Sequence, residues 1–107
     1  MNRKTEYYCG SSLGWSPIFW FEALRSDKDF QARIAVFGDL GTVNGQSIPR
    51  LQQHVHDGEY DAIIHNGDFA YNLDDENGYR GDEYMRQIES FAAYVPYQTS
   101  VGNHEVN

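Results

Sequence analysis

The sequence predicts an α/β fold in which short parallel strands alternate with amphipathic helices. Strand-like runs lie at 32–37, 62–64 and 97–101, and the chain turns after each run at a glycine followed by Asp or Asn. Two stretches with helical spacing of apolar residues separate these runs. Strand-helix-strand units are joined by right-handed crossovers, so a β-α-β-α-β order produces a parallel sheet. The Ile- and Val-containing runs suit strands buried on both faces.

Before this unit lies a segment of different character. Residues 5–22 are dense in aromatic side chains, with Gly, Ser and Pro between them, which predicts two short strands around a turn. A lone hairpin is marginally stable in water, so these aromatic residues require a partner surface. Residues 23–31 are polar and are predicted to be a linker.

Each helical stretch has one apolar face. The first face begins after Ser47, its predicted cap, and ends before Gly58; it consists of Ile48, Leu51 and Val55. The second face follows Asp82, its predicted cap, and consists of Tyr84, Ile88, Phe91 and Val95.

Composition excludes several classes of protein. The chain has 107 residues, the length of one small domain or part of one. Eight basic and sixteen acidic residues give a net charge of −8, which opposes binding to nucleic acids and anionic membranes but suits hard cations. No apolar run reaches the roughly 20 residues of a membrane span, and the N-terminus lacks the apolar core of a signal peptide. With Cys9 as its one cysteine, the chain forms neither an internal disulfide nor a cysteine-based zinc site.

Polar side chains follow the strand ends, and in a parallel sheet those ends share one edge. Asp39, Asp68, Tyr71, Asn103 and His104 are therefore expected to converge there. Carboxylate, phenol and amide oxygens favour hard ions such as Fe(III). Asp68, in the middle motif, is the predicted bridge between two metal ions, which roughly 3.5–4 Å apart would assist phosphoryl transfer.

The three motifs Gly-Asp, Gly-Asp and Gly-Asn-His-Glu resemble those of the calcineurin-like metallophosphoesterases. Most of that superfamily has a histidine two residues after the first Asp, where this chain has Gly41. Together with Tyr71, this exchange resembles the purple acid phosphatases. The segment CGSSLGWSPIFWF resembles the last strands of their fibronectin-like β-sandwich. The resemblance implies a β-domain end at 1–22, a linker at 23–31 and a partial phosphoesterase α/β sandwich at 32–107.

The resemblance also implies a role for each site residue. Asp39 and Tyr71 would bind Fe(III), with Tyr71 as a coloured phenolate, and Asp68 would bridge to a second, divalent metal (Fe, Zn or Mn). Asn103 would bind that second metal, and His104 would contact the phosphate or the leaving group. Glu105 would orient its neighbours. The implied activity is acid hydrolysis of small phosphate monoesters, in a secreted or lysosomal protein.

One departure from the family pattern limits this interpretation. The family has three further histidine ligands downstream of Gly-Asn-His-Glu, and this chain ends at Asn107 with four of the seven ligand positions. His54 and His56 cannot replace them, since they lie two residues apart on different faces of a helix. The sequence therefore predicts a truncated domain that is inactive alone.

Three alternatives stay open. The first is another metallophosphoesterase, such as a phosphodiesterase, against which Gly41 and Tyr71 argue. The second is a remnant with at most weak metal binding. The third is a nucleotide-binding module, but the first strand lacks a GxGxxG pattern and a P-loop lysine.

Overall fold

A computed structural model describes residues 4–43 and 45–106. Three parallel strands form a sheet in the order β5-β6-β7, with bounds β5 (Ile34–Phe37), β6 (Ala62–His65) and β7 (Tyr97–Thr99). The helices α1 (Ile48–His56) and α2 (Tyr79–Ala92) connect them, and the 3-10 helix η1 (Asn103–Glu105) follows β7. The predicted β-α-β-α-β order and parallel sheet are confirmed.

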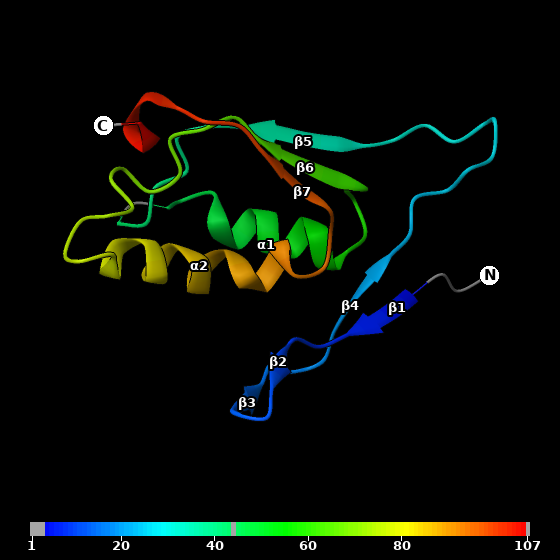
Figure 1. Cartoon of the computed structure of the whole chain (residues 1–107). Helices are drawn as coiled ribbons and strands as arrows, with labels where there is room; N and C mark the ends of the chain where they lie inside the picture. Colours follow the sequence, from blue (N-terminus) through cyan, green and yellow to red (C-terminus); the bar gives the residue numbers. More distant parts are fainter. Residues whose placement is uncertain (1–3, 44, 107) are drawn as a thin grey trace.

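Both helices cover the same face of the sheet (Figure 1). Two right-handed crossovers that step in one direction across a sheet place their helices on one side. The predicted helical faces meet the sheet there: Leu51 and Val55 of α1 and Ile88 of α2 are buried, while Ile63 and Phe91 have no exposed surface. This core fixes the strands whose ends carry the site.

The opposite face of the sheet is exposed, so the prediction of strands buried on both faces is wrong for the described residues. Ile34, Val36 and Ile64 are 46%, 65% and 36% exposed. Their apolar character fits burial, but both helices lie on the other side of the sheet.

The start of α2 also differs from prediction. The helix begins at Tyr79 after Gly78, which adopts φ 85°, and Asp82 lies inside the first turn instead of capping it. Glycine accepts this left-handed conformation at little cost, so the helix starts one turn earlier than the polar residue suggested. Asp82 still places a negative charge near the helix N-terminus, where it is favourable. Ser47 is the N-cap of α1 as predicted, but its side chain makes no capping hydrogen bond.

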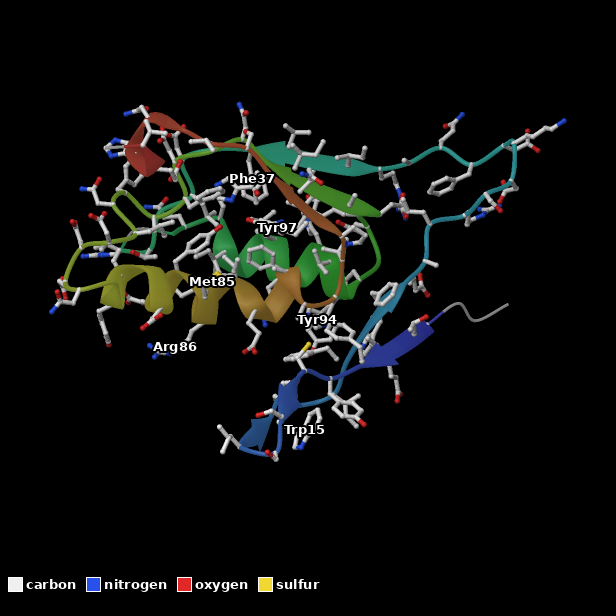
Figure 2. All side chains as sticks on the ribbon, viewed as in Figure 1. Trp15, Phe37, Met85, Arg86, Tyr94 and Tyr97 are labelled. Carbon is white, nitrogen blue, oxygen red and sulfur yellow. The ribbon has the colours of Figure 1, made fainter. Side chains whose placement is uncertain are left out.

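The N-terminal segment folds as a long antiparallel hairpin. β1 (Lys4–Tyr7) pairs with β4 (Phe19–Glu22), and β2 (Gly10–Ser11) pairs with β3 (Gly14–Trp15) nearer the turn. The hairpin meets the end of α2 through Tyr94, as Figure 2 shows, while Trp15 lies farther out and is 63% exposed. The hydroxyl of Tyr7 donates a 2.5 Å hydrogen bond to the carbonyl of Ala93. The predicted strand pair is confirmed, and part of its aromatic surface is covered.

No helix in the described parts of the chain is long and apolar enough to span a membrane. No regular element is assigned between β4 and β5.

Candidate metal centre

The loops that follow β5, β6 and β7 meet at the carboxyl edge of the sheet, beside η1 (Figure 1). Backbone hydrogen bonds join the first two loops: the amide of Asp39 donates to Gly67, and the amide of Gly41 donates to Phe69, at 3.4 and 2.8 Å. The loop after β6 therefore lies against the loop after β5. This brings two sequence-predicted ligand segments together.

Two glycines allow the β6 and β7 loops to cross closely. A Cβ atom on Gly67 would lie 2.4 Å from the amide nitrogen of Gly102, and Gly67 adopts φ 79°. A Cβ atom on Gly102 would lie 2.4 Å from both the amide nitrogen and Oδ1 of Asp68. Any side chain at these positions would displace the loop that carries Asp68.

The first two motifs meet directly through their side chains. The hydroxyl of Tyr71 donates a 2.6 Å hydrogen bond to Oδ1 of Asp39. This bond is the main cause that raises the pKa of Tyr71 to about 12, with smaller contributions from desolvation and from the charges of Asp39 and Asp68. Without a cation the phenol stays protonated at neutral pH.

Three proposed ligand residues have unusual backbone conformations. Asp39, Asp68 and Tyr71 adopt φ 54°, 50° and 54°, in the left-handed region that side-chain-bearing residues seldom occupy. Such conformations cost of order 1–3 kcal/mol each and are concentrated at functional sites. Here they direct side chains of two different loops toward one another.

The glycine at position 41 borders the Tyr71 ring. A Cβ atom on Gly41 would lie 3.8 Å from Cε2 of the Tyr71 ring. This is an ordinary van der Waals distance, and Gly41 adopts φ 74°, a conformation that residues with a side chain seldom occupy. The two positions of the exchange, 41 and 71, are therefore neighbours in the fold.

The third motif packs against Asp68. The amide of His104 donates a 2.9 Å hydrogen bond to Oδ1 of Asp68. The Glu105 carboxylate accepts hydrogen bonds from the amides of Asp68, Phe69 and Gly102, at 2.8, 2.9 and 2.7 Å. Burial favours the neutral acid, but these three bonds outweigh it and lower the pKa of Glu105. Glu105 is thus a charged anchor for the Asp68 loop.

The His104 ring is oriented by neighbours from the second motif. Its Nδ1 lies 3.1 Å from Oδ1 of Asn72, and its ring stands edge-on to the Tyr71 ring with centroids 4.8 Å apart. An amide oxygen only accepts hydrogen bonds, so Nδ1 carries the proton and Nε2 is left for a ligand. Asn72 was not identified as a site residue from the sequence, although its position next to Tyr71 could have suggested it. Asn103 starts η1 and is exposed.

The donor set fits a hard cation. Asp39 and Tyr71 line a cleft of about 400 Å³ together with Gly41 and Arg80. Their two oxygens already share one proton, and a highly charged ion that replaces this proton would contact both. Across residues 4–43 and 45–106, no group of three or more His, Cys, Asp or Glu side chains is close enough to hold a metal.

His65, which precedes the second motif, does not join these donors. Its ring is fully buried, and Nδ1 lies 2.6 Å from the hydroxyl of Tyr97 and 3.1 Å from that of Tyr84. Nε2 has no hydrogen-bond partner among the described residues. Hydrogen bonds thus hold one ring nitrogen of this strand histidine within the core. Burial lowers the pKa of His65, against the opposing influence of Glu105 and Asp39.

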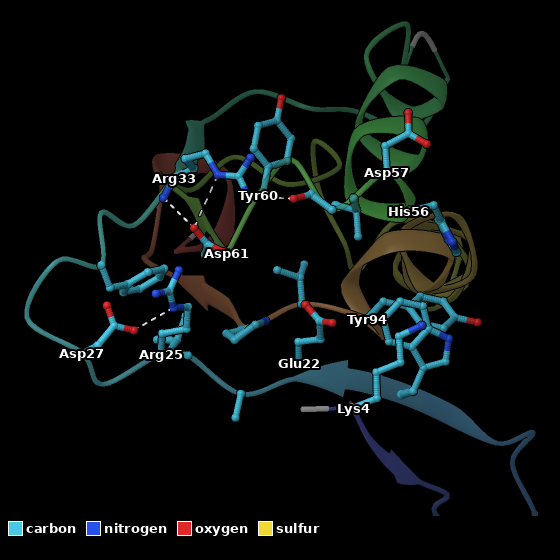
Figure 3. A pocket seen from close by; sticks show the side chains of 18 residues that line it. Lys4, Glu22, Arg25, Asp27, Arg33, His56, Asp57, Tyr60, Asp61 and Tyr94 are labelled. Atoms are coloured by element: carbon cyan, nitrogen blue, oxygen red, sulfur yellow. Dashed lines mark hydrogen bonds and ion pairs between the residues drawn. The ribbon is translucent and has the colours of Figure 1, made fainter. Parts of the chain in front are cut away.

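A larger cavity lies elsewhere, between the hairpin and the ends of the helices (Figure 3). It measures about 610 Å³, and two of its arginines are paired with acids: Arg25 with Asp27 at 2.7 Å and Arg33 with Asp61 at 3.7 Å. None of the strand-end residues lines it, so it is separate from the candidate site.

The fold and the motifs at its sheet edge define a metallophosphoesterase-type α/β protein. Residues 32–107 match the family of calcineurin-like phosphoesterases, and the chain belongs to this family.

Named relatives refine this assignment. The chain is 56% identical to acid phosphatase type 7 of Danio rerio, a match that covers 92% of this chain and 22% of that protein. It is 29% identical to Fe(3+)-Zn(2+) purple acid phosphatase 12 of Arabidopsis thaliana, over 96% of this chain and 23% of that one. The purple acid phosphatase PPD1 from yellow lupin (Lupinus luteus) seeds has a similar structure, with a TM-score of 0.64 and 30% identity over 85% of this chain and 18% of that one. The chain thus spans about a fifth of these relatives, and the resemblance to purple acid phosphatases is confirmed.

Proposed function

We propose that this chain is part of a purple-acid-phosphatase-type enzyme that hydrolyses small phosphate monoesters with two metal ions. The observation that carries the proposal is the contact of Tyr71 with Asp39, at 2.6 Å, beside the Asp68 loop. A metallophosphoesterase fold, an acid phosphatase relative at 56% identity and a purple acid phosphatase relative named for Fe(3+) and Zn(2+) support it. The implied cofactor is Fe(III) with a divalent ion.

The proposed ligand roles are those that the resemblance to purple acid phosphatases implies, and donor chemistry agrees with them. Asp39 and Tyr71 would hold Fe(III), because both are hard oxygen donors and phenolate favours the trivalent ion. Asp68 would bridge the two ions and Asn103 would bind the divalent one. When bound, such a metal pair would supply Lewis-acid stabilisation of the phosphoryl oxygens and an activated water at acid pH.

The remaining residues would position and protonate. His104 has Nδ1 held by Asn72, so its Nε2 would face the ester and, when protonated, donate to the departing alkoxide. Glu105 would keep the Asp68 loop in place through its three backbone hydrogen bonds. We also propose residues 1–22 as the end of a preceding β-domain and 23–31 as its linker.

Titration of the purified chain with Fe(III) tests the metal site. A visible absorption band is expected, because a phenolate bound to Fe(III) absorbs there, and Tyr71→Phe removes only the oxygen that causes it. Tyr79→Phe is the matched control, since Tyr79 is exposed and is not one of the proposed ligands. Absence of a band in the wild-type chain, or a band that persists in Tyr71→Phe, would contradict the proposed site.

A further inference from the structure

Helix α2 holds the loop that carries Asp39 through a second residue of that loop, Thr42. One guanidinium nitrogen of Arg80 donates a 3.1 Å hydrogen bond to the Thr42 hydroxyl. The Gln87 side-chain amide donates a weaker bond, 3.4 Å, to the Thr42 carbonyl. Arg80 and Gln87 are seven residues apart, which is two helical turns, so they share one face of α2. Thr42 is 8% exposed, so both hydrogen bonds involve a buried residue of the loop.

The same helix begins just after the loop that carries Tyr71. Arg80 lies in its first turn, and its guanidinium also forms a 3.5 Å ion pair with Glu76 of that loop. Arg80 also lines the cleft that Asp39 and Tyr71 share. A single side chain thus reaches from the Tyr71 side of the cleft to the Asp39 side.

The Asp39 loop needs such support. Asp39, which carries a side chain, adopts a left-handed backbone conformation with φ 54°. Strained conformations persist only when the surrounding structure fixes them. The hydrogen bond between Tyr71 and Asp39 joins two side chains at an exposed site. The bond from Arg80 instead reaches the hydroxyl of Thr42, a buried residue of the same loop as Asp39.

We propose that Arg80 is a positioning residue that acts through Thr42: it docks the Asp39 loop on α2 and keeps the Asp39 carboxylate facing the Tyr71 phenol. The link to metal binding rests on the proposed function, since it assumes that these two oxygens bind iron. The docking of the Asp39 loop on α2 does not depend on that assumption. Arg80 touches neither oxygen, so its effect is indirect.

Substitutions that change one partner at a time separate this role from general stability. Thr42→Val removes the accepting hydroxyl and keeps the shape, and Thr42→Ser restores a hydroxyl. Arg80→Met removes the donor and keeps the chain length. Arg86→Met is the matched control, because Arg86 lies on the exposed face of α2, as Figure 2 shows, and its ring contact is with Tyr79.

Two measurements on the 107-residue chain test the effect of these substitutions. In the metal-free chain, an NMR cross-peak between the Tyr71 ring and the Gly41 α protons reports docking, since these groups are adjacent. We expect the cross-peak to weaken in Thr42→Val and Arg80→Met and to persist in Thr42→Ser and Arg86→Met. With Fe(III), the first two variants should lose roughly 10- to 100-fold in affinity, as when a partner that orients a ligand is removed.

A wild-type cross-peak or a wild-type iron affinity in Thr42→Val would overturn the proposal. If Arg80→Met does not fold, Thr42→Val decides alone, because it removes one oxygen and its fold can be checked by the NMR signals of Phe91 in the core. If the wild-type chain binds no Fe(III), the proposed function fails, and the cross-peak still decides the positioning role.

Discussion

Tyr71 and Asp39 lie 32 positions apart in the sequence, yet the Tyr71 hydroxyl donates a 2.6 Å hydrogen bond to Oδ1 of Asp39. The phenol ring lies beside Gly41, and the Asp39 carboxylate accepts the hydrogen bond that keeps the phenol protonated. In the metal-free chain this proton joins the two oxygens. A trivalent cation that replaces it would bind both.

Tyr71→Phe tests whether this pair is a metal site. The change keeps the ring packed beside Gly41 and His104 and removes the oxygen. We expect the chain to lose its visible Fe(III) band and to retain less iron after dialysis, while the melting temperature without metal changes little. Asp68→Asn should weaken retention of the metal pair further, because a neutral amide replaces a bridging anion between two cations. A Tyr71→Phe chain that keeps the band would make Tyr71 a packing residue.

Asp39→Asn tests the same pair without metal. The carboxylate raises the pKa of Tyr71 to about 12, so the amide should let it fall toward the ordinary value of 10.0. The raised pKa also makes the free energy of unfolding depend on pH. Its stabilising contribution is complete below the pKa of Tyr71 in the unfolded chain, and it is lost as the pH rises through the pKa in the folded chain. The phenolate absorbance of Asp39→Asn, compared with that of the double variant that also carries Tyr71→Phe, isolates this group. An unshifted Tyr71 would mean that the bond is absent in solution.

The sequence allowed the sheet and the site edge to be predicted because both follow from local patterns. Leu51 and Val55, or Ile88 and Phe91, reveal a helical face by spacing alone, and parallel strands then place Asp39 and Asp68 at one edge.

The contacts that residues of the loops make were not predictable in this way. The bonds of Asn72 to His104 and of Arg80 to Thr42 depend on the path of the chain after each strand, which has no periodicity. The start of α2 at Gly78 was missed for a related reason, because the αL conformation of one glycine overrode the expected cap at Asp82. Burial of the sheet was overestimated because the apolar pattern shows which side chains favour burial. It does not show whether another element covers them.

Gly102→Ala should disturb the site more than the core. Its Cβ atom would lie 2.4 Å from the amide nitrogen and Oδ1 of Asp68, so the Asp68 loop must move. Overpacking of this kind costs about 1–3 kcal/mol of unfolding free energy. Gly14→Ala is the control, with no atom within 4 Å of its Cβ position, and should change stability by about 0.5 kcal/mol or less. Chemical denaturation measures both, and equal effects would show that the close approach is relaxed in solution.

The isolated chain should not hydrolyse p-nitrophenyl phosphate at acid pH, even with iron and zinc added. It supplies four proposed donors, Asp39, Asp68, Tyr71 and Asn103. Even the loss of a residue that merely orients a ligand typically lowers activity roughly 10- to 100-fold. Robust turnover that requires the added metals and disappears in Asp68→Asn would show that these donors suffice.

Folding of the chain should weaken in acid because of His65. Burial lowers the pKa of this histidine from its ordinary 6.5, although Glu105 and Asp39 act in the opposite direction. When pH falls below about 6.5, the unfolded chain binds a proton that the folded chain does not yet accept, so the free energy of unfolding decreases. This loss continues until the pH reaches the pKa of His65 in the folded chain.

His65→Gln removes the titration, and it also leaves the hydroxyls of Tyr84 and Tyr97 within 3.3 Å of each other. We expect the variant to be less stable near neutral pH but to show a shallower decline between about pH 7 and pH 5, measured by urea denaturation at several pH values. Parallel declines in both chains would mean that His65 takes up its proton as easily when folded as when unfolded.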